Sequence, residues 1–486
     1  MRTTFSGISI ALRALQAQQA SLDVTSHNVA NANTPGFSRQ TAILSASKAY
    51  PVPMLSGGVS NGQYGTGVQV SQVARMRDLF VETRIRQESP HLAYWETLQR
   101  GLSQVELFFG EPGESGISAA LDQFWDSLQD LSHGADSDSV REVVVQRAEV
   151  LVEAIRNTRN QLQSLRADLN DNVDVLVSKI NTLAQQIADL NNQIGKVSAT
   201  GNHPNDLMDQ RDLLLEELSQ IAEIEVVDDH ANMVTVTLNG VSLVQRSTAY
   251  RLETYRVPEP KLGYDRYQIR WQGTGSPAVI KSGELGATLA LRDEEVQNYI
   301  DDLDKWTWDF AEAFNKIHRE GFTLDGKTGI DFFEFASSSM PHGAALEIRV
   351  NEDITEDPGK IAAAYFGEDV DEAPPGRIAN GENALRLAQL RYNPPRAGEP
   401  TIGDSFISII SNLGVRAERA VKMAENRSVL VTHLHNLREA TSGVNLDEEM
   451  ANMIKFQHAY NAAARLMTAL DQALDVVVNR LGVVGR

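Results

Sequence analysis

The stretch VNLDEEMANMIKFQHAYNAAARLMTALDQALDVVVNRL, residues 444–481, has the pattern of a helix that lies against another helix. A line of side chains at alternating steps of four and three is apolar throughout, except at two positions. The line consists of Leu446, Met450, Met453, Gln457, Tyr460, Ala464, Met467, Asp471, Leu474, Val478 and Leu481. Asn445 can serve as the N-cap and Glu448 completes a capping box, so the helix has a defined start.

The first helix of the chain, expected from about residue 4 to residue 32, carries a matching line. Its members are Phe5, Ile8, Leu12, Leu15, Gln19, Leu22, Ser26 and Val29. An ordinary amphipathic core helix is the simpler interpretation of either line alone. Because termini are normally the least ordered parts of a domain, the same pattern at both ends predicts that the terminal helices pair as a coiled coil.

Composition excludes several classes of function. The 486 residues carry a formal net charge of -21, which argues against binding nucleic acid or an anionic membrane. The chain has no cysteine, which excludes disulfides, thiolate metal sites and a cysteine nucleophile. Residues 1–15 have no continuous apolar stretch and no small-residue cleavage site, so an ordinary signal peptide is not expected. No apolar run approaches about 18 residues, so membrane insertion is not expected either. If the protein acts outside the cell, it leaves by another route.

The middle of the chain predicts a rod-like helical domain with a β insertion. A third apolar line, from Ala148 to Val197, indicates one helix over about residues 138–197, which would span roughly 90 Å. From residue 224 the period changes to two, with an Asn239-Gly240 hairpin turn. The fold class is therefore mainly α with an inserted β domain. We expect nested, discontinuous domains: 1–45 with 435–486, 46–223 with 284–434, and 224–283.

Shorter elements complete the expected organisation. Residues 38–62 are poorly periodic and rich in proline and glycine, which favours a loop. A short strand over 65–73 leads to a helix over about 78–109, and another helix covers about 286–320. Pro35 and Gly36 predict a sharp turn after the first helix, where Asn28, Asn31 and Asn33 can satisfy free backbone groups.

Both ends of the chain carry motifs of a known family. Residues 22–40, LDVTSHNVANANTPGFSRQ, resemble the N-terminal signature of the bacterial flagellar rod, hook and hook-associated axial proteins. Residues 444–450 with Gln457, Tyr460, Ala464 and Asp471 resemble the closing helix of the same group. Residues 205–219 resemble the N-D-L-x-D-Q-R-D-x-L-x-x-E-L-S block of the hook-associated junction proteins within it.

The resemblance implies a structural, non-enzymatic protein at the junction of hook and filament. It implies export through the flagellar type III apparatus, with an export chaperone on the C-terminal helix. It further implies assembly with copies of itself into a ring or helix, with hook protein on one side and the second hook-associated junction protein on the other. Subunit contacts are expected at the terminal motifs. The residues concerned are Leu12, Leu15, Leu22, Asn28, Asn31, Asn33, Pro35, Gly36, Met453, Tyr460, Met467 and Leu474.

Other functions find little support in the sequence. Residues 321–328, GFTLDGKT, fit the P-loop pattern, but a helix is expected before them and none after, so we interpret them as a turn. No catalytic, cofactor or metal-binding constellation stands out. Two alternatives stay open: a hook or distal-rod protein, which should be rich in β-structure in its middle, and a wall hydrolase carried on axial ends, which would need a clustered acid and base.

Overall fold

The computed structural model describes residues 5–49, 64–111, 113, 116–259, 264–336, 341–367, 380–396 and 398–477. It is 66% helical with small antiparallel sheets, which confirms the predicted fold class. The chain forms two compact units. The terminal unit comprises Met1–Pro90, Lys179–Arg251 and Arg427–Arg486, and the helical unit comprises His91–Ser178 and Leu252–Asn426. The three-part domain division expected from the sequence stays a prediction.

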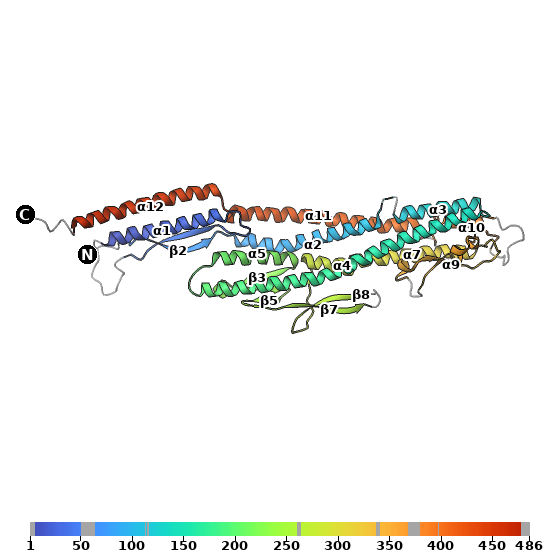
Figure 1. The fold of residues 1–486 in the computed structure, drawn as a ribbon, viewed down its shortest axis with the longest axis horizontal. Helices are drawn as coiled ribbons and strands as arrows, with labels where there is room; N and C mark the ends of the chain where they lie inside the picture. Colours follow the sequence, from blue (N-terminus) through green and yellow to red (C-terminus); the bar gives the residue numbers. More distant parts are fainter. Residues whose placement is uncertain are drawn as a thin grey trace, which may run out of the picture. The chain divides into compact units, whose positions relative to one another are not determined.

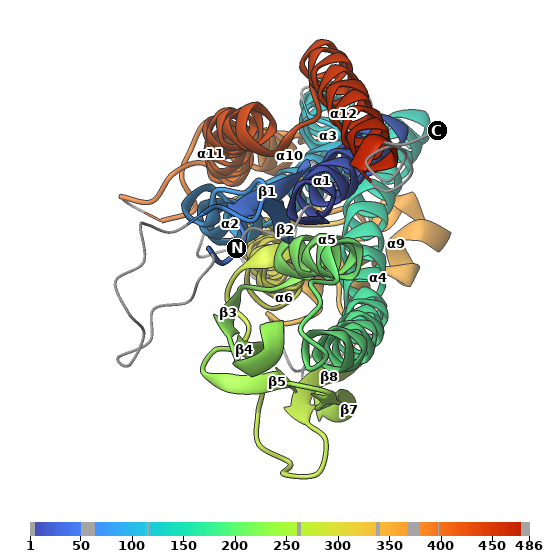
Figure 2. The ribbon, with the colours of Figure 1, turned by 90° about the vertical axis from the view of Figure 1, so that its left-hand side faces the viewer.

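In the terminal unit, helix α1 (Phe5–Ala30) and helix α12 (Leu446–Asp475) lie side by side (Figures 1 and 2). This confirms the predicted pairing of the terminal helices; Val478 and Leu481 lie outside the described residues. Asn28 Nδ2 donates to Glu449 Oε2 at 3.0 Å, and a Cβ on Gly7 would lie 3.2 Å from the Leu470 side chain. Asn28 and Gly7 are 21 residues apart on α1, and Glu449 and Leu470 are 21 residues apart on α12. The later residue of α1 contacts the earlier residue of α12, so the two helices are antiparallel and keep one register between the two contacts.

The contact line of this pair differs from the predicted line by one residue. Steps of seven between the two observed contacts define the line. It comprises Gly7, Ala14, Ser21 and Asn28 on α1, and Glu449, Phe456, Ala463 and Leu470 on α12. Small residues and one polar pair occupy most of it, so a search for large apolar residues cannot find it. Of the predicted line, Leu12, Gln19, Ser26 and Met450 are instead exposed.

The expectation of a loop over 38–62 is wrong for its first part. Strand β1 (Gln40–Ala46) pairs antiparallel with β2 (Val68–Arg75), with a register irregularity between Ile43 and Leu44. Both strands lie against α1, on a different side from α12 (Figure 2). The strand was missed because proline and glycine follow it closely; residues 50–63 lie outside the described part of the chain.

Three long helices contribute residues to both units: α2 (Leu79–Phe109), α4 (Asp138–Ser198) and α11 (Ile402–Ser442). Helix α4 is one continuous helix of 61 residues, and buried side chains from Ala148 to Ile194 follow its predicted apolar line. In the terminal unit, α2 packs on α11 through Val81, Ile85 and Leu434.

A four-stranded antiparallel sheet lies after helix α5 (Asn205–Ile221) in the terminal unit. Its strands, in spatial order, are β3 (Ile224–Asp228), β4 (Val234–Leu238), β5 (Val241–Gln245) and β6 (Thr248–Ala249). Asn239 and Gly240 both have positive φ, 49° and 78°, as the predicted hairpin turn requires. Buried Asn191 of α4 donates to the carbonyls of Val234 and Arg246, each at 2.8 Å, which docks the sheet on α4.

The helical unit is built around aromatic side chains. Its other elements are α3 (Ile117–His133), β7 (Leu252–Glu259), β8 (Tyr264–Trp271), α6 (Gly283–Ala290), α7 (Val296–Arg319), β9 (Phe333–Glu334), α8 (Ala344–Glu347), β10 (Arg349–Val350), α9 (Glu352–Glu356) and α10 (Glu382–Gln389). A π-helical turn, Leu291–Glu295, joins α6 to α7. Phe124, Phe310, Phe314, Phe332 and Phe333 are all buried, with ring centroids 4.8–6.5 Å apart in the contacting pairs.

The segment that fits the P-loop pattern is a turn, as its flanks predict. It follows α7, the N–H of Thr323 donates to the carbonyl of Lys327 at 2.8 Å, and Gly326 has a φ of 77°. No helix of the described chain begins directly after it. His318, at the end of α7, is fully buried beside it. Its Nε2 accepts from the N–H of Ala362 at 3.0 Å, so its Nδ1 donates to the carbonyl of Ile330 at 2.8 Å.

Candidate functional site

The N-terminal motif holds together three elements of the terminal unit through one buried amide. Asn28 Nδ2 donates to the carbonyl of Gln40 at 2.8 Å, and Asn28 Oδ1 accepts from the Gln40 N–H at 2.9 Å. The same Nδ2 donates to Glu449 of α12. Arg39 Nε donates to the other oxygen of Glu449 at 2.7 Å, and the Arg39 N–H donates to the Ser442 carbonyl at 2.8 Å. Helix α1, strand β1 and helix α12 therefore share one set of hydrogen bonds.

The turn after α1 is fixed by its own residues and by α5. Asn31 Nδ2 donates to the carbonyl of His27 at 3.0 Å, and Thr34 Oγ1 donates to Asn31 Oδ1 at 3.1 Å. Gly36 has a φ of 77°, and a Cβ there would lie 3.3 Å from Leu213 Cβ. A residue with a side chain at position 36 would thus meet both backbone strain and close contact. Asn33 and Pro35 are exposed in this chain.

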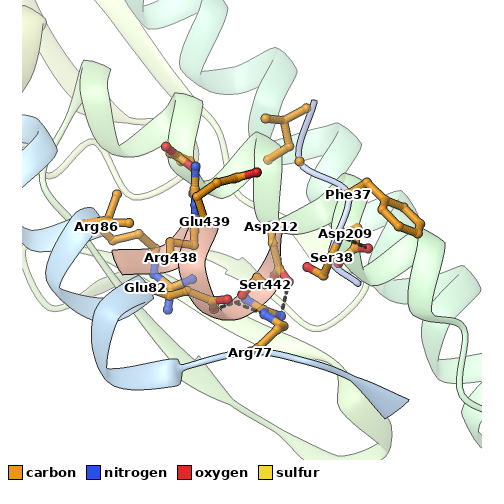
Figure 3. Close-up of a pocket in the computed structure, with 14 residues that line it drawn as sticks. Phe37, Ser38, Arg77, Glu82, Arg86, Asp209, Asp212, Arg438, Glu439 and Ser442 are labelled. Atoms are coloured by element: carbon orange, nitrogen blue, oxygen red, sulfur yellow. Dashed lines mark hydrogen bonds and ion pairs between the residues drawn. The ribbon is translucent and has the colours of Figure 1, made fainter. Parts of the chain in front are cut away.

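The block of residues 205–219, helix α5, carries the charged centre of the terminal unit (Figure 3). Arg75, at the end of β2, donates to Asp209 at 2.7 Å and to Asp212 at 2.8 Å. Arg77 pairs with Asp212 and with Glu82 of α2. All five side chains are largely buried. The ion pairs therefore join the β1–β2 hairpin and the start of α2 to α5.

The two aspartates of this centre differ in pKa because they differ in the number of arginines around them. Burial raises the pKa of Asp209, although Arg75 and the Ser38 N–H oppose this. Burial also acts to raise the pKa of Asp212, but Arg77, Arg211 and Arg75 outweigh it, so the pKa of Asp212 lies below its ordinary value. Asp212 is thus the carboxylate held ionised by its surroundings.

A small cavity of about 80 Å³ lies beside the charged centre. Arg77, Glu82, Asp212, Arg438 and Ser442 are among the residues that line it (Figure 3). The buried Ser442 Oγ has no hydrogen-bond partner among the described residues. A cavity of this size is well below the roughly 300 Å³ typical of sites for small organic ligands.

The structure brings some of the predicted contact residues together and separates others. Met453, Tyr460, Met467 and Leu474 are half-buried along the edge of the α1–α12 contact, as are Leu15 and Leu22 on α1. Leu12 points away from it and is 47% exposed. Sequence reasoning did not identify Glu449, Arg39 or Arg75 as site residues. The motifs at the two ends of the chain contain Arg39 and Glu449 and were the available signal for them. Arg75 lies outside these motifs and outside the 205–219 block, and the fold alone brings it to Asp209 and Asp212.

No group of histidine, aspartate or glutamate side chains in the described part of the chain could hold a metal ion. Among the same residues, no helix is long and apolar enough to cross a membrane. The fold and site define a class: paired terminal helices, joined by motifs from both ends of the chain, with helical and β segments between them. These are features of an axial structural protein of the bacterial flagellum.

Family models agree with this class and narrow it. Residues 102–333 match the helical domain of flagellar hook-associated protein FlgK, residues 8–37 match the flagella basal body rod protein, and residues 439–481 match the flagellar basal body rod FlgEFG protein C-terminal. Flagellar hook-associated protein 1 of Bacillus subtilis is 34% identical over the whole of both chains. That of Escherichia coli is 26% identical over 97% of this chain and 99% of its own.

A solved structure, the flagellar hook junction protein FlgK of Burkholderia pseudomallei, has a similar fold. It matches with a TM-score of 0.63 and 17% identity, over 74% of this chain and all of its own. The chain described here belongs to the family of flagellar hook-associated protein 1. It is a structural component of the flagellum at the junction of hook and filament, and not an enzyme. The alternative of a hook or distal-rod protein is therefore not supported.

Proposed function

We propose that α1 and α12 are the elements that build this chain into the junction, by packing against the terminal helices of neighbouring copies. Apolar side chains left uncovered on both helices carry the proposal. Leu12 is 47% exposed, Met450 56% and Ile454 53%. Large apolar side chains that remain in water on paired helices favour association, because their burial is the main driving force for it.

Leu12, Met450 and Ile454 project to the same side of the helix pair as the half-buried Leu15 and Leu22. Leu15 and Leu22 each come one residue after a member of the α1 contact line, Ala14 or Ser21. Met450 likewise comes one residue after Glu449 of the α12 contact line. Leu12 comes five residues after Gly7 of the α1 line, and Ile454 comes five residues after Glu449 of the α12 line. In an antiparallel pair, positions with the same offset from the contact line project to the same side. The five residues form what we term the open stripe, which could receive a helix from a neighbouring subunit.

The predicted partners follow from this surface. Neighbouring copies cover the open stripe laterally, hook protein lies on one side of the assembled ring, and the second hook-associated junction protein lies on the other. Family membership supports assembly within the flagellum with hook and filament proteins.

Before assembly, a type III export chaperone covers α12. Met450→Asp should then weaken chaperone binding at least about tenfold in calorimetry, because a charge replaces a buried apolar contact; unchanged affinity would contradict this part.

Assembly on isolated hooks tests the proposal. Purified protein should add a short discrete zone to the hook tip in electron micrographs, and a Leu12→Asp, Met450→Asp variant should not. Leu107→Asp is the matched control, since Leu107 is 75% exposed but belongs to the helical unit. All five tryptophans also belong to that unit, so unchanged tryptophan fluorescence would show that it stays folded. Normal zones from the double variant would refute the role of the open stripe.

A further inference from the structure

The two ends of the terminal helix pair differ in character. Near one end, Asn28 and Glu449 are 1% and 2% exposed, which is unusual for an amide and a carboxylate. Near the other end, Gly7 faces Leu470. The contact line between these ends includes the small residues Ala14, Ser21 and Ala463. These small side chains bury little apolar surface between the two helices.

Each side-chain polar atom of Asn28 and Glu449 has a hydrogen-bond partner. The Asn28 amide takes both backbone groups of Gln40 and one oxygen of Glu449. The other Glu449 oxygen accepts from Arg39, whose side chain is 18% exposed. A carboxylate buried without these donors would be strongly unfavourable, so Glu449 is stable at this depth in one position only, opposite Asn28.

We propose that Asn28 and Glu449 are positioning residues that dock α12 on α1 and set the register of the whole pair. The two end motifs of the chain are then direct contact partners, and each is needed for the other. A shift of α12 by one heptad would place Glu449 against Ser21 or leave Asn28 opposite Phe456, and in either case a buried polar group would lose its partner. This concerns pairing within one chain and does not depend on the proposed assembly.

The neighbouring glutamate provides a matched control. Glu448 also accepts from Arg39, at 2.8 Å, but its side chain is 59% exposed and it does not contact Asn28. Removal of either glutamate takes one acceptor from Arg39, so the two variants have this loss in common. Only removal of Glu449 breaks the link to α1.

Disulfide formation at the far end measures docking without disturbing the polar end. The chain has no cysteine, so Gly7→Cys with Leu470→Cys introduces a single reporter pair, at the place where a Cβ on Gly7 would lie 3.8 Å from Leu470 Cγ. We expect Glu449→Ala to slow formation of the intramolecular disulfide at least about tenfold, and Glu448→Ala to change it less than about twofold. Equal rates for the two variants would overturn the proposal.

A double-mutant cycle tests whether the two residues act through each other. If Asn28 and Glu449 form one contact, Asn28→Ala with Glu449→Ala should slow the reporter disulfide no more than about twofold beyond the slower single variant. Slowing equal to the product of the two single effects would mean independent roles and would also overturn the proposal. Tryptophan fluorescence confirms in each variant that the helical unit is intact.

Discussion

The terminal helix pair and the aromatic core of the helical unit hold their helices by opposite means. In the core, large rings such as Phe124, Phe310 and Phe314 are fully enclosed by the chain itself. In the terminal pair, the contact line uses small residues and one polar pair, while Met450 and Leu12 stay in water. The rings of the core are buried within a single chain, whereas the terminal pair leaves large apolar side chains exposed. We propose that neighbouring copies cover the exposed side chains of the terminal pair, whereas the aromatic core needs no partner for its burial.

The largest effect should come from opening the aromatic core. Phe314→Ala should reduce the free energy of unfolding of the helical unit by about 4 kcal/mol, because it removes a ring that packs on several others. Urea unfolding followed by tryptophan fluorescence measures this. Leu107→Ala, at an exposed position of the same unit, should change it little. Equal losses in the two variants would mean that the core is not the source of stability.

A smaller effect is expected at the charged centre of the terminal unit. Asp212→Ala leaves Arg75 and Arg77 short of an acceptor in a largely buried site, so the terminal unit should lose roughly 3 kcal/mol. Hydrogen exchange of the α5 amides is the suitable probe, since tryptophan fluorescence reports only the helical unit. Glu217→Ala removes a half-exposed ion pair with Lys179 and should cost less than about 1 kcal/mol. A larger loss from the control would contradict the ranking.

Acid should destabilise the helical unit through His318. Burial lowers the pKa of His318 to about 4, below the ordinary 6.5, so the unfolded chain binds the proton more tightly. Stability is therefore complete above pH 6.5 and falls as the pH drops toward 4, by about 2 kcal/mol between pH 7 and pH 5. His318→Gln should flatten this dependence, whereas His342→Gln, at an exposed histidine, should keep it. An unchanged slope in His318→Gln would rule out His318 as its source.

The smallest effect concerns the start of α12. Asn445 Oδ1 accepts from the N–H groups of Asp447 and Glu448, at 3.0 and 3.3 Å. Asn445→Ala should cost the helix about 1 kcal/mol, visible as faster hydrogen exchange in its first turns, and Asn445→Asp should preserve the cap. If both variants exchange alike, the cap does not stabilise α12.

The sequence predicted the elements whose signal is repetitive. The α4 line, the Asn239-Gly240 turn and the pairing of the chain ends are confirmed. Apolar periodicity failed where the contact line consists of small or polar residues, as at Gly7 and Ser21. Asn28 was named through its motif and not through periodicity. The pairing of Arg75 with Asp212, 137 positions away, depends on the tertiary fold. Strand β1 was missed because the proline and glycine residues that follow it favour a loop, and its pairing with β2 depends on a separate segment.

The two hydrogen bonds between Asn28 and the backbone of Gln40 also affect the free edge of strand β1. A two-stranded sheet has free edges, and such edges can recruit strands from other molecules. At the first residue of β1, the Asn28 amide occupies both backbone groups that would point to a third strand. At this residue, Asn28 therefore leaves no free backbone group for a strand of another molecule to pair with.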